Sequence, residues 1–123
     1  MKVSKNTTPV FVARQGDVLL RQIEEIPKGA RELKRDKHGR HVLAYGEKTG
    51  HAHTFRDKGV CSLSQLDGDD IEFLLVGGSG ATLRHELIGG KKAEHDPIVV
   101  PPGKYEAAQQ VEYHPVALVR VAD

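Results

Sequence analysis

The chain has 123 residues, with one cysteine, Cys61, and no tryptophan. A single cysteine cannot form a disulfide within the chain, and it cannot supply a zinc site built on several thiolates. Aromatic residues are also scarce, with three Phe and three Tyr. The composition therefore argues against a disulfide scaffold, a thiolate zinc module and a base-stacking surface for single-stranded nucleic acid.

Neither sign of charge dominates, because 18 Lys and Arg stand against 17 Asp and Glu. A strong attraction of the whole domain to nucleic acid or acidic membranes is therefore not expected. No apolar run approaches the roughly 18 residues that a membrane-spanning helix requires. Residues 1–9 are polar and lack the apolar core of a signal peptide. We therefore expect a cytoplasmic protein with no membrane contact.

Turn-forming Gly, Pro and Asp residues recur along most of the chain, about every 8–12 residues, which is typical of sandwiches and barrels. No window carries a stripe with a 3.6-residue period long enough for a major helix. The pattern predicts an all-β fold with about eight to eleven short strands, in a small single-domain barrel or sandwich. We assign this domain to residues 10–123, preceded by a flexible N-terminal arm at residues 1–9.

The expected strands lie between the turn signals, and residues 41–45 and 51–55 are expected to pair as a hairpin. Residues 105–111 are the best candidate for a helix, because Glu, Ala and Gln favour one, but their position after Pro-Pro-Gly favours a strand. Edge strands of such a domain expose backbone donors and acceptors, which favours a homodimer. The expected strands are residues 10–13, 18–23, 41–45, 51–55, 60–66, 71–76, 81–87, 98–100, 105–113 and 116–121.

His51 and His53 are two residues apart in an expected strand, after Gly50. Residues i and i+2 of a strand point to the same face, so the two imidazoles project side by side. This is a common way to present two ligands to one divalent metal ion, and imidazole suits Zn, Fe or Ni. The alternative is that both histidines lie on a solvated strand face or bond to the backbone.

A metal site requires at least one more protein ligand. The sequence does not decide which residue supplies it, although His85 and His95 are the preferred candidates. A set of three histidines, or of two histidines and a carboxylate, would leave a position for water or substrate. The full list of candidates is His85, Glu86, His95, Glu106 and His114.

The sequence is equally compatible with a site that binds no metal. Tyr105, Gln109 and Gln110 could line a polar pocket with the two histidines and bind a small ligand. Histidine titrates near neutral pH, so such a pocket could also carry out acid–base chemistry. The alternative for the two glutamines is an ordinary polar strand face.

A local run of positive charge lies in residues 31–40, interrupted by Glu32 and Asp36. This run is the basis for the hypothesis of a nucleic-acid-binding accessory protein. Its binding to DNA or RNA would weaken steeply as the salt concentration rises. Solvated surface is the favoured interpretation, because few aromatic residues accompany the run. Its members are Arg31, Lys34, Arg35, Lys37 and Arg40.

Two short segments resemble the motifs of cupins, small β-barrels that often hold a metal on histidines. Gly50-His51-Ala52-His53 resembles the first motif, and residues 101–105 resemble the opening of the second. Glu106 stands where the second motif has its histidine, and Asp57 is the only residue available as the acidic ligand that follows the first pair. The resemblance implies a cupin-like barrel with metal on His51 and His53.

A second resemblance covers most of the chain. Residues 14–20, 46–53 and 97–113 look like a group of short uncharacterised proteins of bacteria and their phages. This resemblance brings no known activity, and it makes a regulatory or host-interaction role as plausible as a metabolic one.

Three functional hypotheses follow. The first is a small metal-binding β domain using a histidine cluster, with or without metal-assisted chemistry. The second is a non-catalytic accessory module that binds a small molecule or a protein. The third is a nucleic-acid-binding accessory protein. The sequence does not decide whether the protein is an enzyme.

Overall fold

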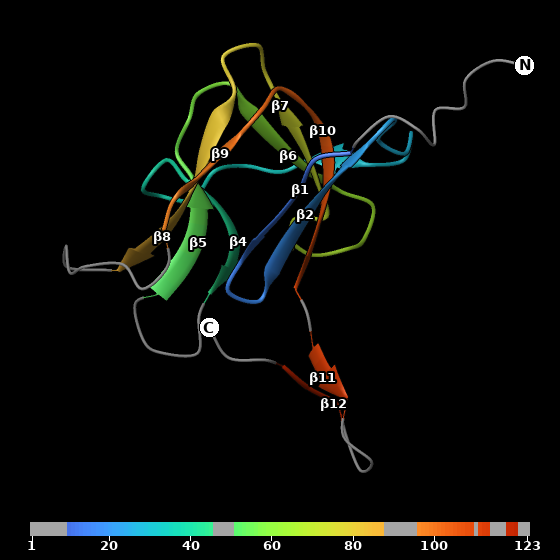
Figure 1. Ribbon diagram of the computed structural model, residues 1–123. Helices are drawn as coiled ribbons and strands as arrows, with labels where there is room; N and C mark the ends of the chain where they lie inside the picture. The colour runs from blue at the N-terminus through green and yellow to red at the C-terminus, as the bar shows by residue number, and fades with distance from the viewer. Residues whose placement is uncertain (1–9, 46–50, 88–95, 110, 114–117, 121–123) are drawn as a thin grey trace, which may run out of the picture.

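The computed structural model describes residues 10–45, 51–87, 96–109, 111–113 and 118–120 (Figure 1). These residues contain twelve strands and no helix, which confirms the all-β prediction. The strands are β1 (Val12–Gln15), β2 (Val18–Ile23), β3 (Arg31–Glu32), β4 (His41–Tyr45), β5 (His51–Phe55), β6 (Val60–Ser64), β7 (Phe73–Val76), β8 (Ala81–Leu87), β9 (Ile98–Val100), β10 (Gly103–Gln109), β11 (Val111–Tyr113) and β12 (Leu118–Arg120).

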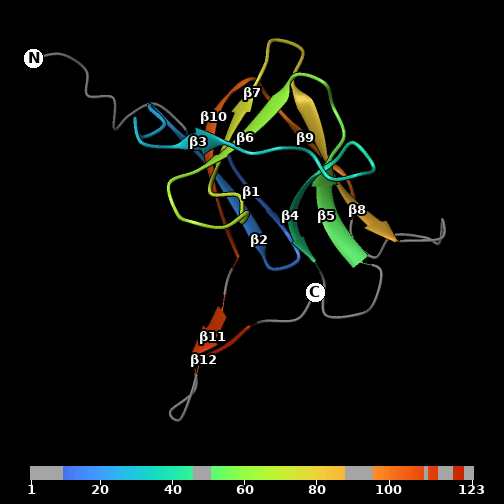
Figure 2. The ribbon, with the colours of Figure 1, turned by 180° about the vertical axis from the view of Figure 1, so that it is seen from behind.

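The strands form two larger antiparallel sheets that face each other (Figure 1). The first sheet has six strands in the order β1-β2-β10-β7-β6-β3, and the second has four in the order β4-β5-β8-β9. Strands β11 and β12 form a separate hairpin that extends away from both sheets (Figure 2). The two sheets do not close into one barrel, so the arrangement is an open sandwich and gives no confirmation of a cupin fold.

The expected strands overlap the observed ones, including the antiparallel pairing of β4 with β5. Several ends are shifted by about two residues; the first strand covers residues 12–15 where 10–13 was expected. Two larger differences concern the number and division of strands. The charged pair Arg31–Glu32 forms the short strand β3 against β6, which gives twelve strands rather than eight to eleven. The expected strand at residues 105–113 is divided, because β10 belongs to the six-stranded sheet and β11 to the separate hairpin. The N-terminal arm lies outside the described residues.

The hairpin of β1 and β2 turns in two residues, Gly16 and Asp17, because Gln15 pairs directly with Val18. Gly16 has a φ of 59°, a conformation that costs glycine little and favours it at the first position of a tight hairpin turn. The hairpin therefore fixes the side chains of Gln15, the last residue of β1, and of Asp17, in the turn, at one end of the sandwich.

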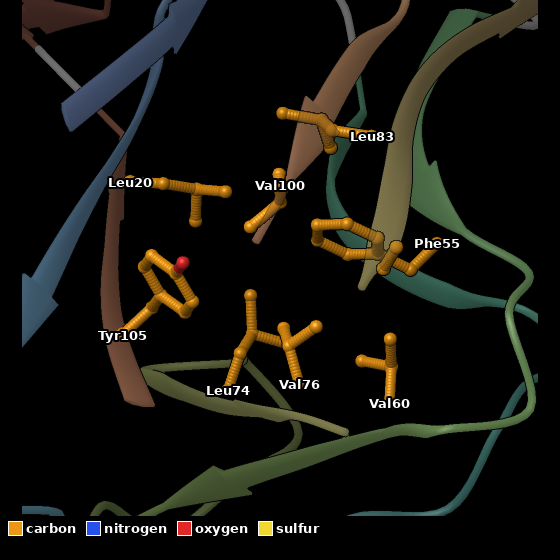
Figure 3. Packing of buried hydrophobic residues seen from close by; sticks show 9 residues of the cluster. Leu20, Phe55, Val60, Leu74, Val76, Leu83, Val100 and Tyr105 are labelled. Atoms are coloured by element: carbon orange, nitrogen blue, oxygen red, sulfur yellow. The ribbon is translucent and has the colours of Figure 1, made fainter. Parts of the chain in front are cut away.

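The core lies between the two sheets (Figure 3). Side chains of the six-stranded sheet meet Phe55 and Leu83 from the four-stranded sheet, and these two are 0% exposed. Burying a side chain of this size contributes about 1.5–3 kcal/mol. The residues contributed by the six-stranded sheet are Leu20, Val60, Leu74, Val76 and Tyr105.

The outer side of the four-stranded sheet carries an ion network. Arg40 bonds to Asp36 at 2.9 Å and to Glu86 at 3.1 Å, and Glu86 also accepts a bond from Arg56. Burial alone would raise the pKa of Glu86, but the hydrogen bonds from Arg56 and Arg40 outweigh it and hold this pKa below its ordinary value. Glu86 stands opposite Ala52 of β5, so the network helps to bury β5 on its outer face.

In the part of the chain that the structure describes, no helix is long and apolar enough to cross a membrane.

Candidate functional site

Strands β5 and β8 bring three histidines together on the face that looks into the sandwich. His51 and His53 share this face with Phe55, as the alternation of a strand requires. The pairing of β5 with β8 sets His85 directly opposite His53. The three residues are 7%, 0% and 3% exposed, in the order His51, His53 and His85. The prediction that the histidine pair shares a face is thus confirmed, and the face is interior, not solvated.

The ring of His85 contacts the rings of both other histidines. The ring centres of His53 and His85 are 4.7 Å apart with a tilt of 44°, and those of His51 and His85 are 5.1 Å apart with a tilt of 55°. Three imidazoles bound to one tetrahedral ion, at about 2.0–2.1 Å from each nitrogen, would have ring centres about 5 Å apart. The spacing of the rings therefore suits a shared ion.

The β1–β2 hairpin adds two polar side chains to this cluster, Gln15 from the end of β1 and Asp17 from the turn. Gln15 Oε1 lies 2.9 Å from His53 Nδ1. Asp17 Oδ1 lies 3.8 Å from His53 Nε2, and the side chains of Asp17 and His53 are 2% and 0% exposed. We call the set of His51, His53, His85, Asp17 and Gln15 the histidine cluster.

Gln109 of β10 connects the histidine cluster to a cleft. Its side-chain nitrogen donates a 2.6 Å hydrogen bond to Asp17 Oδ2. Gln109 also lines a cleft of about 1010 Å³ between the sheets, together with Val18, Leu43, Ala44 and Ala107. The three histidines are not among the residues that line this cleft, so Gln109, through Asp17, is a link between the cleft and the cluster.

Imidazole nitrogens and a carboxylate oxygen are the donors that bind divalent first-row metal ions. Among the described residues, however, no three His, Cys, Asp or Glu side chains form a group arranged to hold a metal ion. The rings are close, but their nitrogens are not placed around a common point, so coordination of one ion would require side-chain rotation. The cluster is thus a set of ligand-type side chains and not a preformed coordination shell.

Four other candidates are placed away from the cluster. Glu86 lies on the opposite side of β8 from His85 and bonds to arginines. Glu106 pairs with Arg21 at 2.7 Å on the exposed side of the six-stranded sheet. Tyr105 is 0% exposed in the core. Asp57 accepts a bond from the backbone nitrogen of Thr82. His95, Gln110 and His114 lie outside the described residues.

The arginines of the basic run make contacts within the protein. Arg35 donates to the carbonyl oxygens of Gly39, Asp57 and Val60. Arg40 is 7% exposed and belongs to the ion network. These guanidinium groups are thus committed to internal carbonyl and carboxylate oxygens, which weakens the case for a phosphate-binding surface.

His41 is a fourth buried histidine, and it lies apart from the cluster. Its Nε2 lies 3.1 Å from the carbonyl oxygen of Val60 and its Nδ1 lies 2.7 Å from Ser62 Oγ. A carbonyl only accepts, so Nε2 carries the hydrogen and Nδ1 accepts from the hydroxyl. Burial, reinforced by the charge of Arg35, lowers the pKa of His41 below its ordinary value. Ser62 and Val60 therefore hold a neutral histidine with a structural role.

Fold and site together define a class: a small open β-sandwich with a buried cluster of three histidines and one carboxylate between its sheets. A family model for a domain of unknown function, DUF8820, matches residues 14–110, and the chain belongs to that family. The matched segment contains all five members of the histidine cluster. No curated protein and no solved structure matches the chain.

Proposed function

We propose that the protein binds one divalent first-row transition metal ion, of the type of Zn, Fe or Ni, through His51, His53 and His85. Asp17 is the additional donor. The observation that carries the proposal is the contact of three interior imidazoles with ring centres 4.7 and 5.1 Å apart, beside a buried carboxylate. Binding requires rotation of the rings until their nitrogens converge.

The energetics of burial support this proposal. Groups that are charged or strongly polar are costly to remove from water unless they are compensated. Here a carboxylate and three imidazoles share one interior region, next to an apolar core. A cation held between them would give the carboxylate a charge partner beyond its hydrogen bond from Gln109 and would use the imidazole lone pairs, so metal binding would contribute directly to the free energy of folding.

The resemblance of Gly50-His51-Ala52-His53 to the first cupin motif implies metal on the same two histidines. In the proposed site the third histidine comes from His85 of β8, and the carboxylate comes from the β1–β2 turn, so Glu106 is not needed. A metal bound there would act as a Lewis acid on a ligand that reaches it past Gln109.

Thermal unfolding of chelator-treated protein tests the proposal, with and without Zn²⁺, Ni²⁺ or anaerobic Fe²⁺. At a free metal concentration of 100 times Kd, one ion stabilises the folded state by about 2.7 kcal/mol. For a domain of this size we expect Tm to rise by about 10 °C. The rise should disappear in His51→Ala/His53→Ala and persist in the exposed-histidine control His38→Ala. Equal shifts in all three proteins would contradict the proposal.

A second candidate function is the binding of a small organic molecule in the cleft. The cleft is at the upper end of the range of ligand sites, roughly 300–1,000 Å³. Its lining combines apolar side chains and the amide of Gln109 with charged side chains, among them Arg35 and Asp70. This function predicts stabilisation of chelator-treated protein by a member of a metabolite panel, reduced in Ala107→Trp. Stabilisation that Ala107→Trp leaves unchanged would place the ligand elsewhere.

A further inference from the structure

We infer that Gln15 is a positioning residue that selects Nε2 of His53 as the atom presented to Asp17 and to the proposed metal. The selection works through hydrogen bonds that fix, one after another, the orientation of an amide and the tautomer of a ring. Its consequence for metal binding rests on the proposed function, whereas the tautomer itself does not.

The first step is the orientation of the Gln15 amide. Its nitrogen donates to two backbone carbonyl oxygens, that of Leu83 at 3.1 Å and that of Asp96 at 2.9 Å. Carbonyl oxygens only accept, so the nitrogen end of the amide must face them. The reversed amide would set its oxygen against two acceptors. This settles the orientation of a group whose oxygen and nitrogen are otherwise hard to distinguish.

The second step is the tautomer of His53. The orientation of Gln15 places Oε1 2.9 Å from His53 Nδ1. An amide oxygen accepts and cannot donate, so Nδ1 must carry a hydrogen. A neutral imidazole has one N–H, and its other nitrogen, Nε2, then carries the lone pair.

The third step is the direction of that lone-pair nitrogen. Nε2 of His53 lies 3.8 Å from Asp17 Oδ1, between side chains that are 0% and 2% exposed. Two donors bound to one tetrahedral ion at about 2.0–2.1 Å would be about 3.3 Å apart. The observed separation is thus close to that of two ligands sharing a cation. Gln15 supplies the partner for the other ring nitrogen, as polar groups around metal ligands commonly do.

The hydrogen bonds of Gln15 connect three separate parts of the fold. It belongs to β1, whereas its acceptors are Leu83 of β8 and Asp96, two residues before β9. The ring of His53 is therefore held by an amide that is itself anchored to the strand of His85 and to the segment entering β9.

Nitrogen NMR of chelator-treated protein with ¹⁵N-labelled histidine, at a pH where the rings are neutral, reads the tautomer directly. We expect His53 to show a protonated Nδ1 and an unprotonated Nε2. In Gln15→Met, which keeps the length of the side chain but removes its acceptor, this tautomer should lose its dominance, and the affinity for Zn²⁺ should fall by about 10–100-fold. Gln15→Glu keeps an acceptor for Nδ1–H and should keep the tautomer, although it loses both donor bonds.

Gln22→Met is the matched control, because Gln22 also bonds to a backbone group, the nitrogen of Phe11, but lies outside the cluster. It should change neither the His53 tautomer nor the affinity. An Nε2–H tautomer in the wild-type protein would overturn the inference, and so would an unchanged tautomer in Gln15→Met. The expected tautomers together with no uptake of Zn²⁺ would support the role of Gln15 in orienting His53 and contradict the proposed function alone.

Discussion

Tyr105 is fully buried, and its hydroxyl donates a 2.6 Å hydrogen bond to the carbonyl oxygen of Pro101. Its ring meets that of Phe11 edge to face, with centres 5.9 Å apart. Burial raises the pKa of the Tyr105 hydroxyl, so the group stays protonated and able to donate. Its contacts therefore assign Tyr105 to the core and to the turn before β10.

Removing this hydroxyl tests that assignment. Tyr105→Phe keeps the ring and leaves the carbonyl oxygen of Pro101 without the donor, so we expect the free energy of unfolding to fall by about 1 kcal/mol. Uptake of metal should not change, because the hydroxyl is not a ligand. Urea unfolding and metal titration check both parts. A loss of metal affinity would contradict the assignment and would indicate that Tyr105 belongs to the metal site.

The histidine cluster could be predicted only in part. The pairing of His51 with His53 could be predicted, because a two-residue spacing in a strand gives two side chains a common face whatever the partner strands are. His85 remained one of several candidates, since the register of β5 against β8 is set by pairing that the local sequence does not encode. Asp17 was assigned only to a turn, and its proximity to His53 depends on how the two sheets face each other.

At the scale of elements, the ion network connects the turn before β4 to β8. The Arg40 side chain is 8% exposed, whereas that of Arg56 is 48% exposed, although both bond to Glu86. Solvent screens the exposed pair, which is worth about 0–1 kcal/mol. The buried guanidinium of Arg40 is less screened, and its removal would leave Asp36 without its ion-pair partner and Glu86 with only the exposed Arg56.

Two substitutions compare these environments. We expect Arg40→Met to lower the free energy of unfolding by about 2–3 kcal/mol, near the lower end of the cost of breaking a buried pair because the carboxylates keep some solvent. Arg56→Met should cost at most about 1 kcal/mol. The measurement is chemical unfolding of both variants at pH 7, and equal losses would contradict the distinction.

The strands themselves were largely predictable, because short apolar runs bounded by Gly, Pro and Asp recur along the chain. Strand β3 was not, since Arg31 and Glu32 have little strand preference and pair with β6 only through tertiary contact. The end of β10 was also missed. Residues 105–113 read as one strand, but the partners of β10 and β11 differ, and partner choice is a property of the whole fold.

At the scale of the whole molecule, His41 makes stability depend on pH. Its folded pKa lies below the ordinary 6.5, so the unfolded chain takes up a proton as the pH falls through about 6.5 while the folded chain does not. Stability is therefore lost on acidification, with a slope of up to about 1.4 kcal/mol per pH unit from this residue. The pairing of Glu86 adds a separate loss at lower pH, below its ordinary value of 4.5.

Urea unfolding of chelator-treated protein at pH 7.5 and 5.5 isolates the contribution of His41. His41→Gln should lose less stability between the two pH values than the wild-type protein, because it no longer titrates. The exposed control His38→Gln should match the wild-type loss. The histidines other than His38 and His41 are present in all three proteins and contribute equally to the pH dependence of their stability. Identical losses of stability in the three proteins would therefore contradict a neutral, buried His41.

The central claim is that His51, His53 and His85 hold one metal ion, and equilibrium dialysis followed by elemental analysis tests it most directly. Chelator-treated protein is dialysed against a buffered micromolar concentration of Zn²⁺, and bound metal is counted per folded chain. We predict one ion per chain in the wild-type protein and in His38→Ala, and almost none in His51→Ala/His53→Ala that circular dichroism shows to be folded. The same metal content in the double variant, or none in the wild-type protein, would contradict the claim.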